Sequence, residues 1–223
     1  MAAITWDGRK EHLYETGVDR GVFYDYDTTK DEYSPGHAWN GLIDVSLNPE
    51  GGEPNVFYAD NIKYISIPSI EEFGFSIRAY TYPEEFKKCD GTVALAPGVY
   101  IGQQLRSTFG FCFRTLIGDE IEYDKRGYTL HLIYGATASP TTRDFESKND
   151  SPNPNEFEWE CDTTPVSVTG NAPTSIVEID STKVDRTKLT ALEAILYGSA
   201  ESDPKLPLPD EIYTMFRTAN TNP

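Results

Sequence analysis

The sequence predicts a mainly β fold: two packed antiparallel sheets, arranged as a sandwich or an open barrel, with one flanking α-helix. Three observations predict this class. Aromatic residues make up 13% of the chain, including 14 tyrosines, and aromatic side chains pack well on strands. Roughly eight to ten segments alternate apolar and polar side chains between glycine- and proline-rich breaks. Helical spacing of apolar residues is clear in one stretch only, near the C-terminus.

The first half of the chain predicts short strands. The first is expected over 21–26, and a longer one over 39–47, where apolar residues alternate with polar ones. Two further short strands are expected over 56–58 and 64–67. The alternation is clear over 39–47, so one face of that strand should point to the core.

The middle of the chain gives the clearest pattern. A strand is expected over 73–82, followed by one helical turn over 83–88, which begins with proline, carries acids early and ends with lysines. Two strands over 109–116 and 128–136 each place large apolar residues on one face. The charged segment 118–127 between them predicts a hairpin.

The last third changes from strand to helix. Apolar residues at helical spacing predict a helical C-terminal segment over 184–217, in which Asp185 caps the main helix and Gly198 ends it. Asp210 is expected to cap a last short helix that continues to Phe216. Before this segment the expected strands are 156–161, 164–168 and 174–180.

The chain is expected to form a single domain over residues 1–223. A domain of this size buries enough surface to fold without disulfides. Its polar, glycine- and proline-rich stretches predict three long loops, near 28–38, 48–62 and 139–155.

The charge of the chain is strongly negative. It has 19 basic and 36 acidic residues, a net charge of −17 at pH 7, and the acids are spread along the whole sequence. A protein that binds DNA by neutralising phosphates is therefore disfavoured, because its field would repel them. Improved solubility is the simplest role for this charge.

Three cysteines, Cys89, Cys112 and Cys161, stand far apart and form neither a disulfide framework nor a zinc-binding pair. Cys112 and Cys161 lie in strand-like runs, where buried free thiols are expected, and a reducing compartment such as a bacterial cytoplasm is indicated. Residues 1–10 lack the pattern of a secretory signal, and no apolar run is long enough to span a membrane.

Motifs of catalysis or cofactor binding are not found. The sequence contains no GxSxG, no GxxxxGK and no HExxH, so no enzyme, cofactor or metal site is expected. Asp25, Asp27 and Asp31 have the spacing of a calcium loop, but Lys30 stands where such a loop needs glycine, which favours a solvated turn. His131, in the middle of a strand, is expected to be a hydrogen-bonded polar neighbour rather than a catalytic base.

An acidic strand is the most informative local pattern. Phe157, Trp159 and Cys161 alternate with acids, and a period of two puts the acids on one face of the strand. Like charges about 7 Å apart repel, so this face must meet water or basic partners. Both an ordinary solvated face and a dedicated acidic wall fit the pattern. The acids are Glu156, Glu158, Glu160 and Asp162, and the candidate basic partners on other strands are Arg78 and Arg114.

Several phrases of the sequence, in order over about residues 20 to 215, are those of one protein family. They are YADNIKY (58–64), EEFG (71–74), AYTYPEEF (79–86), PGVYIGQQ (97–104), LIYGATA (132–138), TTPV (163–166) and IDS (179–181). The chain thereby resembles the major tail tube proteins of long non-contractile-tailed bacteriophages.

The resemblance implies a structural virion protein rather than an enzyme. Such proteins form hexameric rings that stack into a hollow tail tube, in which one sheet of each subunit contributes to a continuous barrel around the channel. The tube assembles in the host cytoplasm around a tape measure protein, meets tail terminator and distal tail or baseplate proteins at its ends, and conducts genomic DNA without binding it specifically. No cofactor and no membrane take part.

The acidic strand gains a candidate role from this resemblance. Glu156, Glu158, Glu160 and Asp162 are candidates for the lumen, where they would repel phosphates and let DNA slide. The three long polar loops suit contacts between rings.

A carbohydrate-binding β-sandwich is the alternative. Trp39, Trp159, the many tyrosines and the acidic segment 25–32 support it. A glycoside hydrolase is a third hypothesis, which needs two carboxylates facing each other across a cleft.

Overall fold

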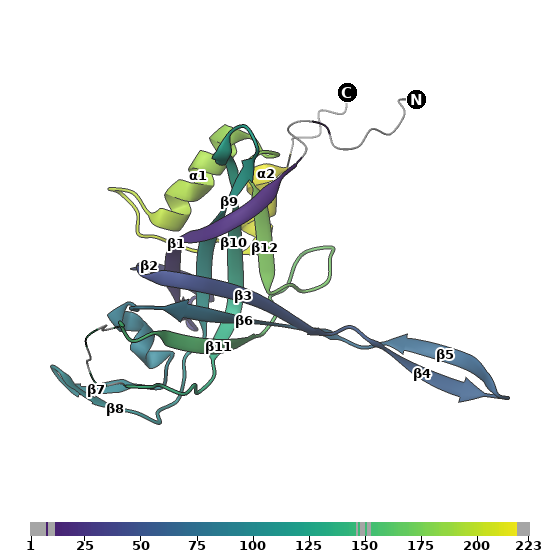
Figure 1. The fold of residues 1–223 in the computed structure, drawn as a ribbon, viewed down its shortest axis with the longest axis horizontal. Coiled ribbons are helices and arrows are strands. Elements are labelled where there is room, and N and C mark those ends of the chain that lie inside the picture. The colour runs from purple at the N-terminus through teal and green to yellow at the C-terminus, as the bar shows by residue number, and fades with distance from the viewer. Residues whose placement is uncertain (1–7, 9–11, 146, 148–149, 151–152, 218–223) are drawn as a thin grey trace.

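The computed structural model describes residues 8, 12–145, 147, 150 and 153–217. Strands take up 51% of the chain and helices 12%, and all strand pairs are antiparallel, which confirms the predicted β-sandwich with flanking helices. Figure 1 shows three layers: two helices, a first section of sheet, and a second section folded over it. Two hairpins project from this body.

One eight-stranded sheet provides both sections. Its order is β2-β1-β9-β10-β11-β6-β3, and β12 pairs beside β10. The bounds are β1 (Tyr14–Asp27), β2 (Glu32–Trp39), β3 (Leu42–Gly51), β6 (Glu71–Ala79), β9 (Phe109–Asp119), β10 (Tyr123–Ala138), β11 (Phe157–Thr163) and β12 (Ile176–Asp180).

Strand β10 divides the sheet because it changes partner along its length. Residues 129–133 pair with β12, and residues 136–138 pair with β11. Gly135 lies at the change with a φ of +62°, and a Cβ there would lie 2.1 Å from the carbonyl oxygen of Thr164. Only glycine fits this approach. The first section is therefore β2, β1, β9, β10 and β12, and the second is β11, β6 and β3.

Aromatic side chains fill the core between the two sections. Trp39 and Trp159 meet edge to face with ring centroids 5.4 Å apart, and Phe75 stacks on Phe111 at 6.1 Å. The short 3-10 helix η1 (Glu84–Lys88), at the predicted helical turn, inserts Phe86 among these rings. Aromatic pairs of this kind add stability beyond the apolar area that they bury.

A second core lies between the first section and the helices. Helix α1 (Arg186–Tyr197) begins as predicted: the carboxylate of Asp185 accepts hydrogen bonds from the backbone N–H groups of Thr187 and Lys188, at 2.9 and 3.0 Å. It ends before Gly198, which has a positive φ. Its buried residues are Leu189, Leu192 and Leu196.

Helix α2 (Pro209–Phe216) begins two residues earlier than predicted, because its N-cap is Leu208 and not Asp210. Leu208 holds the N-cap position, and its N–H donates to the carboxylate of Glu211 at 2.8 Å. Asp210 therefore caps no helix; it accepts hydrogen bonds from the N–H and hydroxyl of Thr169 instead. Proline at the first helical position explains the earlier start, because its missing N–H costs nothing there.

Two of the expected long loops are wrong, because both contain strands. Within 28–38 only the turn at 28–31 is irregular, and β2 follows; Pro35 and Gly36 conceal this strand in the sequence, but an edge strand tolerates them. Within 48–62, β3 continues to Gly51 and β4 (Pro54–Ala59) follows. The described residues of 139–155 form no helix or strand, and residues 146, 148–149 and 151–152 of that loop lie outside the described part.

The segment between β3 and β6 forms a long hairpin, which we call the arm: β4 and β5 (Ile62–Pro68). A two-residue turn, Asp60-Asn61, joins its strands with both φ angles positive, at 51° and 63°. Asp and Asn adopt this conformation more readily than other side chains, and it matches the twist of a hairpin. Figure 1 shows the arm extending away from the body.

Two other strand predictions also need correction. Residues 39–47 do not form one strand, since the chain turns at Gly41 (φ +76°) between β2 and β3. Residues 164–168 contribute only an isolated bridge between Val166 and Thr174. A second hairpin, formed by β7 (Val93–Ala96) and β8 (Val99–Ile101), lies in a part of the chain for which the sequence predicts no strand.

Cys112 and Cys161 are free and buried, as expected, and Cys89 is free and buried as well. Burial is the main cause that raises the pKa of each thiol, to about 12 for Cys89 and higher for the other two. No helix in the described residues is long and apolar enough to cross a membrane.

Asp119 organises the turn between β9 and β10. Its side chain is only 1% exposed, accepts hydrogen bonds from the N–H groups of Glu122 and Ile121 at 2.6 and 2.7 Å, and pairs with Arg126 at 2.6 Å. These backbone hydrogen bonds, helped by Arg126, lower the pKa of Asp119. The turn therefore depends on an ionised carboxylate.

Because the folded pKa of Asp119 is lowered, its contribution to stability is present above the unfolded value of about 3.9 and is lost as pH falls through the folded value. We expect Asp119→Asn to lower the melting temperature at pH 7 and to make it fall less between pH 7 and pH 3 than in the wild type. Calorimetry at the two pH values measures this. Asp124→Asn, at an exposed position of the same hairpin, is the control; parallel pH profiles for wild type and Asp119→Asn would contradict the assignment.

Candidate functional site: an acidic sheet face and two exposed hairpins

Strand β11 carries the acidic stretch as the alternation predicted. Trp159 and Cys161 are buried in the aromatic core, and Phe157 is half-buried on the same side. The intervening carboxylates point away from the core and are exposed. They are Glu156, Glu158, Glu160 and Asp162.

Neighbouring strands extend this acidic surface, because residues opposite each other in a sheet share a face. Glu158 lies opposite Arg78 of β6, and Arg78 lies opposite Asp44 of β3. At the far end of the same two strands, Glu50 lies opposite Glu72. We define the acidic face by its seven exposed carboxylates: Asp44, Glu50, Glu72, Glu156, Glu158, Glu160 and Asp162.

Arg78 lies among these carboxylates, as predicted for a basic partner. One of its terminal nitrogens lies 3.7 Å from Oε2 of Glu156, and its register partners are Glu158 and Asp44. Its Nε atom is buried and has no hydrogen-bond partner among the described residues. Arg78 thus balances part of one end of the acidic face and leaves the rest negative.

Arg114 does not reach the acidic face, so its expected role there is wrong. Its Nε and Nη2 donate to both carboxylate oxygens of Asp19 on β1, at 2.7 and 2.6 Å, and its guanidinium lies over the ring of Tyr128. This bidentate pair raises the pKa of Arg114. The side chain lies on the face of β9 that α1 covers, beside Leu189, whereas the acidic face belongs to the other section.

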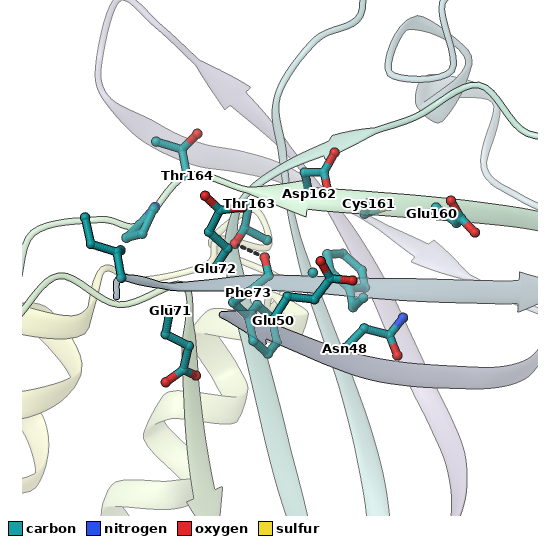
Figure 2. Close-up of a pocket in the computed structure, with 14 residues that line it drawn as sticks. Asn48, Glu50, Glu71, Glu72, Phe73, Glu160, Cys161, Asp162, Thr163 and Thr164 are labelled. Atoms are coloured by element: carbon teal, nitrogen blue, oxygen red, sulfur yellow. Dashed lines mark hydrogen bonds between the residues drawn. The ribbon is translucent and has the colours of Figure 1, made fainter. Parts of the chain in front are cut away.

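A surface groove of about 600 Å³ lies at the end of the acidic face, where β3 and β6 continue toward the arm. Figure 2 shows Glu50 and Glu72 on one side of it and Asp162 on the strand beside them. Ile70 adds an apolar wall. Carboxylates on both sides favour water or cationic groups and disfavour anions.

Two of the three aspartates with calcium-loop spacing, Asp27 and Asp31, make hydrogen bonds within a turn, whereas Asp25 pairs with Lys88 at 2.8 Å. Asp27 accepts hydrogen bonds from the N–H groups of Thr29 and Lys30, and this lowers the pKa of Asp27. Asp31 accepts a hydrogen bond from the hydroxyl of Tyr26 at 2.6 Å. In the described part of the chain, no group of three His, Cys, Asp or Glu side chains has the geometry to hold a metal ion.

His131 joins four strands through a polar network. Its Nδ1 lies 3.1 Å from Glu178 on β12, its Nε2 lies 2.9 Å from the hydroxyl oxygen of Thr115 on β9, and that hydroxyl donates to Glu15 on β1. Partial burial alone would raise the pKa of Glu15, but hydrogen bonds from Thr115 and Thr129 and the charge of His131 outweigh it and lower that pKa. A hydroxyl, an imidazole and a carboxylate in line have the order of a catalytic triad. The Thr115 proton, however, is donated to Glu15 rather than to the ring, so this network holds strands together.

The arm exposes apolar side chains on its strands. Phe57 lies opposite Ile65, and Ile67 lies two residues further on the same face. All three are exposed, as are Tyr58 and Tyr64 near the tip. A two-stranded hairpin alone in water is marginally stable, so these side chains have the character of a contact surface.

The hairpin of β7 and β8 also presents apolar residues to solvent. Leu95 and Val99 are exposed on it, and Leu105 is exposed just after it. Its base is held in place by Tyr100, whose hydroxyl donates to Glu84 and whose ring lies 3.6 Å from the ammonium of Lys87. These contacts fix the hairpin to η1.

The sequence contains signals for both parts of the site. Asp44 and Glu72 stand at polar positions of alternating strands, so their place on the acidic face could have been inferred. Asp60-Asn61 between two apolar runs is a known hairpin signal. The exposure of the arm had no such signal, because its alternation is that of a half-buried strand.

In comparisons with known proteins, no family model matches the chain, and no curated protein matches it.

We expect Arg78→Gln to lower the free energy of unfolding by about 0.5–1 kcal/mol at low salt, since the carboxylates around it lose their counter-charge. Adding salt to about 0.5 M should remove most of the difference, because screening then acts over a few ångströms. Urea unfolding at both salt concentrations measures it. Arg78→Lys keeps the charge and is the matched control. An equal, salt-independent loss in both variants would show that packing, not charge, is what Arg78 contributes.

Proposed function

We propose that the protein is the structural subunit of a bacteriophage tail tube. In this proposal, copies form hexameric rings that stack around a tape measure protein, with terminator and distal tail or baseplate proteins at the ends. The acidic face lines the channel through which DNA passes. The protein belongs to the virion tail and assembles in the host cytoplasm.

The observation that carries the proposal is the position of the acidic face in the sheet. Its outermost strand, β3, pairs on one side with β6 and has no strand on its other side within the described chain. An edge strand can pair with another chain. A ring of copies joined along this edge would continue the acidic face from one subunit to the next, and the resemblance to tail tube proteins implies such a barrel.

The electrostatics support a conduit rather than a binding site. DNA binds tightly where basic side chains replace counterions around phosphates, and an acidic face does the reverse. With seven exposed carboxylates and Arg78 as their near counter-charge, phosphates would be repelled and DNA could slide.

The two tryptophans that favoured a carbohydrate-binding module do not support it. Trp39 and Trp159 are 3% and 0% exposed, in contact with each other in the core. Neither side chain is available to a sugar ring. We therefore favour self-assembly over carbohydrate binding as the function.

We expect the purified protein to form rings or hollow tubes as its concentration rises, because the free edge of β3 and the exposed hairpins become covered. Negative-stain electron microscopy and sedimentation velocity over a concentration series measure this. A uniform monomer at every concentration would contradict the proposal. A glycan-array screen of that monomer would then test the carbohydrate-binding alternative.

We expect Glu158→Lys/Glu160→Lys to leave the fold intact but to make assembled tubes retain DNA, with binding at low salt at least about tenfold tighter than for the wild type. Co-sedimentation of short duplex DNA with tubes measures it. Glu122→Lys/Asp124→Lys changes the net charge equally at exposed positions of the β9–β10 turn and is the matched control. Equal DNA retention by both variants would contradict a lumenal position of the acidic face.

A further inference from the structure

The two exposed apolar hairpins lie on opposite sides of the molecule. Figure 1 shows the arm at one end of the long axis and the β7–β8 hairpin toward the other end. Within one chain, therefore, neither hairpin covers the other. A second copy placed head to tail along this axis would bring an arm near a β7–β8 hairpin.

The arm and the β7–β8 hairpin are also nearly free of charged residues. The chain carries a net charge of −17, so two copies repel each other over most of their surfaces. The stretch 54–70, which contains the arm, has one acid, Asp60, and one base, Lys63. The stretch 91–105, which contains the β7–β8 hairpin, has no charged residue. These are places where two acidic copies can approach without like-charge repulsion.

The surfaces are also of matching chemistry. The arm offers an aromatic and aliphatic face of Phe57, Ile65 and Ile67, and the hairpin offers Leu95 and Val99. The arm projects into solvent, whereas the hairpin is fixed to η1 through Tyr100. Contact between the projecting arm and the anchored hairpin is favourable, because only the arm loses conformational freedom when the two meet.

We propose that the arm of one copy docks on the β7–β8 hairpin and the following segment, to Leu105, of the next copy. This proposal rests on the self-assembly proposed above and specifies which surfaces meet. The interface is heterologous, because two different patches meet, and such contacts repeat into closed rings or open filaments. The occupant of each hairpin is thus a second copy of the chain rather than another protein.

A charge exchange tests the contact. Ile65→Asp and Leu95→Lys are each expected to raise the concentration needed for assembly at least about tenfold, as loss of a central interface contact does. The combined Ile65→Asp/Leu95→Lys variant is expected to assemble better than either single variant at low salt, because the new charges attract. Ile65 and Leu95 are 47% and 67% exposed, so the fold should survive, which circular dichroism verifies. Tyr123→Asp, at a residue 69% exposed elsewhere, is the control. Normal assembly of both single variants would overturn the docking.

Cross-linking locates the contact directly. A photoreactive benzoylphenylalanine at Phe57, activated in assembled protein, is expected to link to residues 93–105 of another copy, as identified by mass spectrometry. Assembled rings with links to other segments would overturn the docking and leave the proposed function standing. Wild-type protein that never assembles would overturn both.

Discussion

The layered structure depends on the change of hydrogen-bonded neighbour in β10 at Gly135. A strand edge can pair with one strand at a time, so β12 and β11 must share the same edge of β10 in succession. The positive φ of Gly135 and its close approach to Thr164 let the second section turn away at this point. The apolar sides of β11, β6 and β3 then face the first section, and their polar sides face outward. The acidic face exists as a surface because the sheet divides here.

The distribution of charge and apolar surface makes high solubility compatible with self-association, two properties that usually conflict. A high net charge keeps copies soluble and apart, whereas assembly requires them to touch. In this chain seven exposed carboxylates lie together on one sheet face, and two hairpins that extend from the body carry exposed apolar groups of their own. If copies assemble as proposed, protruding contacts would let them meet while most of their charged surfaces remain separated by water.

The fold class, most strands and helix α1 could be predicted because each depends on local pattern. Alternation along β11 placed its acids on the face of the strand that points away from Trp159 and the core. The capping role of Asp185 followed from its position before a helical repeat. The position of Arg114 could not be predicted, because strand order decides which face a residue shares with the acids. Pro35 and Gly36 concealed β2, since the rule that they break strands does not hold at a sheet edge. The division at Gly135 depends on contacts distant in sequence, which no local pattern contains.

The three buried thiols determine how the chain would respond to oxidising surroundings. A thiol reacts with oxidants and disulfides as its thiolate, and burial raises the pKa of Cys89, Cys112 and Cys161 so far that almost none is ionised at neutral pH. The chain can therefore pass from reducing to oxidising surroundings without forming mixed disulfides or cross-links between subunits.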